Sequence, residues 1–344
     1  MQFGLFCAPS AATPSHGPDT GQGFHDWIDF NVEAERLGFH SSFLVEHHFT
    51  GWNQSSATLM MLACLAMRTT TMRVGTAVAV LPWHNNPALL AEQVTTLDVM
   101  SKGRFDFGIG KGYRHNEFAG FMMAPEEADP RFEEAIEFLR RAFVPERFSF
   151  DGRFFKYDNI VIEPPPYQKP HPPYWVAAGN PHSITRAAQR GFNLILDQYA
   201  SPATLGERIA IYKAAREASG HGFNPMQVAV ARQLYVAKDK VDKDEALARQ
   251  RAYTQRTINA SRNPKGKKDG AADSHVMAYA DRAGATEENA LYGTPEEICA
   301  MLEALKKAKV GYILFTVNGG TEQIRRFARD VMPAFAGERA AAAE

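Results

Sequence analysis

Residues 72–110, MRVGTAVAVLPWHNNPALLAEQVTTLDVMSKGRFDFGIG, contain the pattern that decides the fold. An apolar, β-branched run over 72–82 predicts a strand, and residues 103–110 predict a second one. Between them, Pro87 opens a segment with helical spacing that extends to about Met100. A helix that joins two apolar strands in this way is typical of a parallel sheet.

The same alternation runs through the whole chain of 344 residues. It predicts strands at 2–8, 41–47, 72–82, 103–110, 172–178, 192–197, 226–237 and 311–317. Helices are expected at 24–39, 55–69, 87–100, 130–143, 181–191, 204–220, 294–310 and 322–335. Eight strand–helix pairs favour an α/β protein with a (β/α)8 TIM barrel, a single domain over residues 1–337. A doubly wound open sheet is less consistent, because the turn after the first strand is not glycine-rich.

Two stretches interrupt this alternation. Residues 145–171 predict a small β-hairpin, with Asp151 and Gly152 at its turn. Residues 238–292, after the seventh strand, are polar and charged, and we expect either a lid over the catalytic face or a solvated surface excursion. Residues 338–344 are expected to be a frayed tail.

The composition narrows the range of partners. A formal net charge of −1 gives no electrostatic reason to expect nucleic acid or an anionic membrane as a partner. The longest apolar run, residues 57–67, is too short to cross a bilayer, and the first residues do not resemble a signal peptide. Cys7, Cys64 and Cys299 are far apart, so neither a disulfide framework nor a zinc knuckle is expected. We therefore expect a cytoplasmic protein whose substrate is a small molecule.

Polar residues follow the second predicted strand, at the end where TIM barrels carry their active sites. They are Glu46, His47 and His48. Because successive side chains of a strand point to opposite faces, the two histidines cannot easily bind one ion. Few carboxylates or histidines follow the other strands, so we predict no metal site.

Two glycine-containing turns predict an anion site at the same end of the barrel. Residues 108–114 combine several glycines with Lys111. Residues 179–183, which include Gly179, Asn180 and Ser183, open a helix whose free N–H groups favour a phosphate. Arg131 lies near the start of another predicted helix and is a further candidate.

The segments VEHHF (45–49), LLAEQVTTLDVMSKGRFDFGIGKG (89–112) and VAAGNPHSITRAA (176–188) resemble the bacterial luciferase-like flavin monooxygenases. The resemblance implies a barrel that takes reduced FMN from a separate NAD(P)H–flavin reductase. It also implies that O2 adds at flavin C4a, and that the resulting peroxide oxygenates a small apolar or aromatic substrate. A homodimer is a further expectation, with the helices at 55–69 and 87–100 as candidate surfaces.

The resemblance also implies roles for single residues. His47 corresponds to the catalytic histidine, and Glu46 and His48 are its expected supporters. The bond between Ala77 and Val78 corresponds to a non-prolyl cis peptide beneath the flavin ring.

Other matched positions concern the phosphate and the substrate. Lys111 and Arg131 correspond to basic phosphate contacts, and Asn180 and Ser183 to polar ones. Gly110 stands where the luciferases have a reactive cysteine. The glycine argues against light emission and implies room for another substrate beside the flavin ring.

Two alternatives remain open at this stage. One is a hydride-transfer oxidoreductase of the same fold that depends on the deazaflavin F420. The other is a non-catalytic flavin-binding or accessory subunit. The identity of the substrate, and the choice between hydroxylation and Baeyer–Villiger insertion, also remain open.

Overall fold

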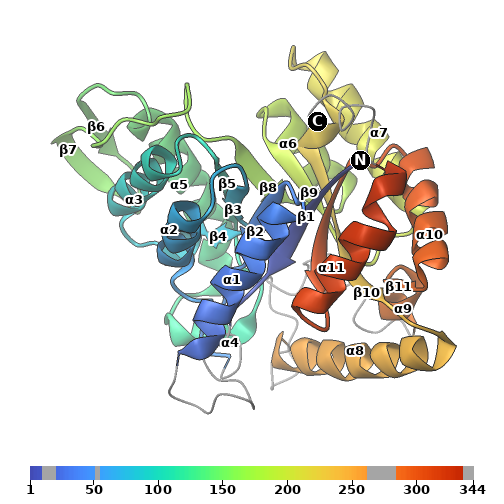
Figure 1. The fold of residues 1–344 in the computed structure, drawn as a ribbon. Coiled ribbons are helices and arrows are strands. Elements are labelled where there is room, and N and C mark those ends of the chain that lie inside the picture. The colour runs from blue at the N-terminus through green and yellow to red at the C-terminus, as the bar shows by residue number, and fades with distance from the viewer. Residues whose placement is uncertain (10–20, 51–54, 262–283, 336–344) are drawn as a thin grey trace.

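A computed structural model describes residues 1–9, 21–50, 55–261 and 284–335. Parallel strands pair in the closed order β1–β2–β3–β5–β8–β9–β10–β12, and β12 pairs with β1 to complete a barrel (Figure 1). The predicted TIM barrel is confirmed. Its strands are β1 (Gln2–Cys7), β2 (Ser41–Leu44), β3 (Arg73–Thr76), β4 (Ala79–Val80), β5 (Phe105–Gly110), β8 (Tyr174–Ala177), β9 (Asn193–Leu196), β10 (Val228–Val236) and β12 (Tyr312–Val317).

The segment 72–110 forms the expected strand–helix–strand unit, with one difference. The predicted strand over 72–82 is split into β3 and β4, which both pair with β5. The helix α3 (Pro87–Met100) begins and ends at the predicted residues. Asn86 caps it, because its side-chain oxygen accepts the backbone N–H of Leu89 at 3.1 Å.

Eight of the described helices follow the strands of the barrel and pack around it (Figure 1). Apolar side chains fill the layer between the helices and the outer face of the strands. A second apolar group, which includes Phe43, Trp175 and Leu314, fills the barrel interior. The helices are α1 (Gln22–Arg36), α2 (Thr58–Arg68), α3, α5 (Ala128–Ala142), α6 (Pro181–Gln189), α7 (Pro202–Ala218), α10 (Pro295–Lys307) and α11 (Thr321–Asp330).

The first interruption is the hairpin that the sequence predicts. Strands β6 (Phe148–Asp151) and β7 (Lys156–Ile160) pair in antiparallel fashion. The backbone N–H of Gly152 donates to the carbonyl of Phe155 at the turn.

The second interruption is more ordered than a surface excursion. It contains the 22-residue helix α8 (Lys240–Ser261), the short helix α9 (Ala285–Glu288) and β11 (Leu291–Gly293), which pairs in parallel with β10. Helix α8 contacts α4 (His115–Gly120), and both lie at the same end of the barrel (Figure 1). The described part of this segment thus lies at the end of the barrel where a lid was expected, and its role as a lid stays a prediction. Residues 262–283 and the predicted tail at 338–344 lie outside the described residues.

Candidate active site at the barrel mouth

Glu46 follows β2 at the barrel mouth, which is the end of the barrel where the strands terminate, and only 5% of its surface is exposed. One carboxylate oxygen lies 3.0 Å from Nε2 of His48. The other accepts the backbone N–H of Val80 at 3.1 Å and lies 3.3 Å from Nε2 of His84. Burial alone would raise the pKa of Glu46, but these hydrogen bonds outweigh burial and lower the pKa to about 2. Glu46 is therefore ionised at neutral pH and links the end of β2 to β4.

His47 has a different partner. Its Nδ1 lies 3.0 Å from Oε1 of Glu117, and the same oxygen accepts the backbone N–H of His48. Burial lowers the pKa of His47; the hydrogen bond with Glu117 opposes this effect, and nearby Arg114 adds to it. The net lowering favours a neutral imidazole at pH 7. In that form Nδ1–H donates to Glu117, and Nε2 keeps its lone pair.

His48 lies among aromatic rings. Its ring centroid is 4.9 Å from that of Phe121, 5.5 Å from Trp83 and 5.8 Å from Phe49. The imidazoles of His47 and His48 thus have separate surroundings, as expected, although both residues lie beyond the end of β2 at Leu44 and strand alternation is not the cause. Within the described ranges, no group of three or more histidine, cysteine or acidic side chains could hold a metal ion.

The gap between β3 and β4 contains the predicted backbone feature. The peptide bond between Ala77 and Val78 is cis. Gly110, at the end of β5, packs against this bend, because a Cβ added to Gly110 would lie 2.3 Å from Cγ2 of Val78. Gly110 was expected to leave room for a substrate. That expectation is wrong for the space that a side chain at position 110 would occupy. Val78 fills that space, and the glycine permits close packing of β5 against the bend.

Two of the predicted phosphate contacts lie near the start of α5. Nζ of Lys111 is 2.5 Å from a carboxylate oxygen of Asp129. Nε of Arg131 donates to Glu127 at 2.7 Å, and its guanidinium lies 4.4 Å from the ring centroid of Phe154. Each of these cations is paired with an acid at a solvent-accessible position, and such ion pairs are weak. A bound phosphate could therefore replace Asp129 and Glu127 as the partner of the two cations at little cost.

The other predicted phosphate contacts lie at the start of α6. Asn180 caps this helix: its Oδ1 accepts the backbone N–H of Ser183 at 2.9 Å, which leaves Nδ2 able to donate. Gly179 precedes the cap and is buried. Glu133 of α5 pairs with Arg186 of α6 at 2.7 Å, which holds the two helices together. The free N–H groups at the starts of α5 and α6 are of the kind that favours an anionic group.

The opposite side of the mouth carries neutral side chains, which we call the amide side. Its members are Gln198, Tyr199, Gln233, Gln250, Tyr292 and Asn318. Nδ2 of Asn318 lies 3.0 Å from Oε1 of Gln233, 3.1 Å from Oε1 of Gln250 and 2.5 Å from the hydroxyl of Tyr292. Strands β10 and β12, the β11 strand and helix α8 are joined by this one amide group.

The amide side continues toward β9. Nε2 of Gln233 donates to Oε1 of Gln198 at 2.8 Å, and Nε2 of Gln198 donates to the hydroxyl of Tyr199 at 2.7 Å. Burial raises the pKa of Tyr199 to about 12, so its phenol stays protonated at neutral pH. This side can bind polar groups by hydrogen bonds but offers no group that titrates near pH 7.

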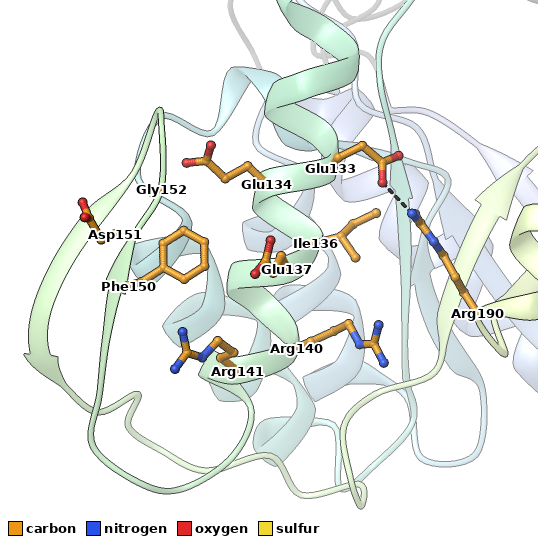
Figure 2. Close-up of a pocket in the computed structure, with 10 residues that line it drawn as sticks. All are labelled: Glu133, Glu134, Ile136, Glu137, Arg140, Arg141, Phe150, Asp151, Gly152 and Arg190. Carbon is orange, nitrogen blue, oxygen red and sulfur yellow. Dashed lines mark hydrogen bonds and ion pairs between the residues drawn. The ribbon is translucent and has the colours of Figure 1, made fainter.

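A surface hollow lies away from the mouth, between α5 and the β6–β7 hairpin (Figure 2). Figure 2 shows Glu133 turned toward Arg190, to which it is bonded at 2.5 Å. Glu134 accepts the backbone N–H groups of Phe154 and Phe155 at 2.8 Å. These two acids hold the hairpin and α6 against α5, so we assign the hollow a structural origin.

Three residues of the site were missed by sequence reasoning. Glu117 lies on α4, a helix of six residues that no periodicity revealed. Arg114 and His84 each follow a predicted strand, but their residue types gave no reason to single them out. Together with the predicted Glu46, His47 and His48, they form what we call the charged side of the mouth. A sequence signal was available in HNEF (115–118), where Glu117 follows Gly110 by seven residues.

Comparison with known proteins identifies the family and agrees with the barrel fold. A model of the luciferase-like monooxygenase family matches residues 1–311. An uncharacterized protein of Sinorhizobium fredii, y4vJ, is 31% identical over 240 residues, which cover 70% of this chain and 68% of that protein. The oxygenase component of the flavin-dependent trigonelline monooxygenase of Acinetobacter baylyi is 25% identical over 359 residues, covering 97% of this chain and 96% of that protein.

Two further similarities bear on the cofactor. The crystal structure of monooxygenase RslO1 from Streptomyces bottropensis superposes with a TM-score of 0.81 and 27% identity, covering 98% of this chain and all of that one. An F420-dependent glucose-6-phosphate dehydrogenase of Intrasporangium calvum is 33% identical over 184 residues, covering 50% of this chain and 54% of that protein. This chain is thus similar both to a relative named as flavin-dependent and to one named as F420-dependent.

Proposed function

Because this chain belongs to the luciferase-like monooxygenase family, we propose that it is a monooxygenase that uses reduced FMN and O2 to oxygenate a small apolar or aromatic substrate. The observation that carries the proposal is His47, which Glu117 holds at the barrel mouth. His47 follows β2 three residues after Leu44, whose carbonyl accepts the backbone N–H of Ala77 at the cis bond. Reduced FMN would supply the electrons that activate O2. One oxygen atom would enter the product and the other would leave as water.

In this proposal His47 holds or moves a proton. A neutral imidazole with Nδ1–H fixed on Glu117 has one remaining nitrogen, Nε2, that can accept a proton and return it. Glu46 keeps His48 and His84 in place and supports the backbone of β4 through Val80. His48 thus acts as a positioning residue within the aromatic cluster.

We take FMN as the cofactor, because the relative from Acinetobacter baylyi is named as a flavin-dependent monooxygenase. Lys111, Arg131, Asn180 and Ser183 would hold its phosphate at the start of α5 and α6. The relative from Acinetobacter baylyi is named as an oxygenase component, which supports a separate reductase as the transient partner that supplies the reduced flavin.

F420 is the alternative cofactor, and the F420-dependent relative is the observation that favours it. The test is anaerobic titration of the purified protein with reduced FMN and, separately, with reduced F420. Candidate substrates and 18O2 are then added together with a flavin reductase, and the products are analysed by mass spectrometry. We expect tight binding of reduced FMN and one 18O atom in the product. Binding of F420 alone would support hydride transfer, and FMN binding without oxygen transfer across the screen would support an accessory subunit.

A homodimer is also part of the proposal. Exposed apolar side chains gather on α2 and α3, and a second copy of the chain would cover them. They are Met60, Met67, Leu89, Val99 and Met100. The double substitution Met60→Glu and Met67→Glu should convert the dimer into a monomer in light scattering coupled to size exclusion. An unchanged mass would place the interface elsewhere.

A further inference from the structure

Arg114 is a buried cation, and two of the three nitrogens of its guanidinium make no hydrogen bond. It follows β5, caps the start of α4 with its backbone, and is 4% exposed. Nε and Nη1 of its guanidinium have no hydrogen-bond partner. It also forms no ion pair within 4.0 Å with any acidic residue of the described ranges.

Another buried arginine of the same barrel, Arg232, has the hydrogen-bond partners that Arg114 lacks. Arg232 in β10 is 1% exposed, and its guanidinium donates to the backbone carbonyls of Asp197, Ala200 and Ala231 at 2.6–3.1 Å. A buried charge without such partners costs stability, and native proteins rarely keep one unless it serves a ligand.

Arg114 lies next to the proposed reaction centre. Its charge lowers the pKa of His47, and its guanidinium carbon lies 5.7 Å from the ring centroid of Tyr113. The ring of Tyr113 in turn meets that of His47 edge-on, with centroids 6.3 Å apart. Tyr253 of α8 is within electrostatic range of Arg114, so the helix over the mouth borders the same place.

We propose that Arg114 binds a carboxylate group of the substrate, which places the rest of the substrate beside His47. This proposal rests on the monooxygenase function proposed above, which defines the substrate. A neutral carbonyl would accept a hydrogen bond from the guanidinium, whereas a carboxylate would accept two and also carry the opposite charge. A phosphate dianion fits less well, because it would bring two negative charges close to the buried carboxylate of Glu117.

Ligand binding tests this directly and requires no turnover. The protein, loaded with oxidised FMN, is titrated by calorimetry with matched pairs: benzoate and benzamide, nicotinate and nicotinamide, phenylacetate and phenylacetamide, hexanoate and hexanamide. We expect at least one acid to bind ten times more tightly than its amide, and Arg114→Met to abolish that preference while FMN affinity stays the same. A chain in which no acid is preferred, or in which Arg114→Met keeps the preference or loses FMN instead, overturns the proposal. Failure of oxygen transfer alone would leave this result intact and would count against the proposed function.

Thermal unfolding without ligand gives a second, independent readout. Arg114→Met removes a buried guanidinium whose Nε and Nη1 have no hydrogen-bond partner, so its Tm should fall clearly less than that of a variant that loses a buried arginine with full hydrogen bonding. The matched control is Arg232→Met, which removes a buried arginine with three carbonyl partners and should lower the Tm by several degrees. A comparable drop for Arg114→Met would assign this arginine a structural role and overturn the proposal.

Discussion

The two sides of the barrel mouth are built from different chemistry. The charged side, at the ends of β2, β4 and β5, combines two buried carboxylates with three histidines and a buried arginine. The amide side, at the ends of β9, β10 and β12, joins amides and phenols through uncharged hydrogen bonds. A proton can therefore be held or released on the first side, whereas the second keeps the same hydrogen bonds as the pH changes. We infer that the charged side serves the reaction and that the amide side holds the frame and the polar parts of bound molecules.

The largest effect is expected from removing the imidazole of His47, which tests whether the charged side serves the reaction. His47→Gln should reduce product formation by about 10²- to 10⁴-fold at saturating reduced FMN, because a positioned proton acceptor is lost. FMN affinity should stay the same. The measurement is product formation by mass spectrometry. His221→Gln, which changes a histidine bonded to the carbonyl of Gln189 far from the mouth, is the control and should leave the rate unchanged. Equal rates for wild type and His47→Gln would remove His47 from the mechanism.

The second prediction concerns the acid stability of the charged side. The pKa of Glu46 falls from its ordinary 4.5 in the unfolded chain to about 2 in the folded protein. Its contribution to the free energy of unfolding is therefore complete above pH 4.5 and is lost as the pH falls toward 2. At about 1.4 kcal/mol per pH unit the loss is on the order of 3 kcal/mol.

Glu46→Gln keeps the side-chain shape without the charge, so it isolates this term from those of other acids. The stability advantage of the wild type over this variant, measured by urea unfolding, should shrink between pH 4.5 and the lowest pH at which both variants fold. A constant difference would mean that the hydrogen bonds of Glu46 do not depend on its charge.

The third prediction separates positioning from catalysis. Glu117→Gln weakens the hydrogen bond that fixes His47, and a hydrogen bond to a charged group contributes about 1.5–3 kcal/mol. The expected loss of rate is thus roughly 10- to 100-fold. The carboxylate of Glu117 raises the pKa of His47, so in the variant the acid limb of the pH–rate profile should move to lower pH. A slower rate with an unmoved acid limb would indicate that Glu117 affects only the local fold.

Sequence patterns predicted the barrel well because its strands are short apolar runs between helical segments. Each strand can be identified from the pattern of its own residues. The bend at Ala77 and Val78 is different, since no periodicity signals a cis bond. It was expected only through the resemblance to known flavin monooxygenases. The space beside Gly110 was misjudged for a related reason: a missing side chain in the sequence does not reveal which neighbour fills its place.

The candidate site was predicted in part. Glu46, His47 and His48 stand directly after a strand, so their position at the mouth could be inferred. Glu117 reaches His47 from a separate helix 70 residues later, and only the tertiary structure brings them together. Gln250 lies in a segment whose polar composition suggests a solvated surface, yet its side chain is buried in the amide side. Composition alone cannot show which few polar residues of such a segment face inward.

The smallest predicted effect belongs to the amide side and completes the contrast. Asn318→Ala removes the donor that serves Gln233, Gln250 and Tyr292, and it leaves buried acceptors unsatisfied at a cost of about 1–3 kcal/mol. All of these partners are uncharged, and burial raises the pKa of Tyr292, so the loss should be the same from pH 5 to pH 9.

Asn318→Asp has nearly the same shape but places a carboxyl group against two amide oxygens, Oε1 of Gln233 and Oε1 of Gln250. These oxygens and burial favour the protonated acid, so the pKa of the new carboxyl should be raised in the folded protein. Its stability should then be greatest at low pH and decrease as the pH rises through that raised pKa, which is opposite in sign to the behaviour of Glu46. Urea unfolding of both variants over this pH range measures the difference. A pH-dependent loss in Asn318→Ala would show that the amide side is coupled to a titrating group, and that protons are not confined to the charged side. A pH-independent stability of Asn318→Asp would contradict the raised pKa expected for the new carboxyl.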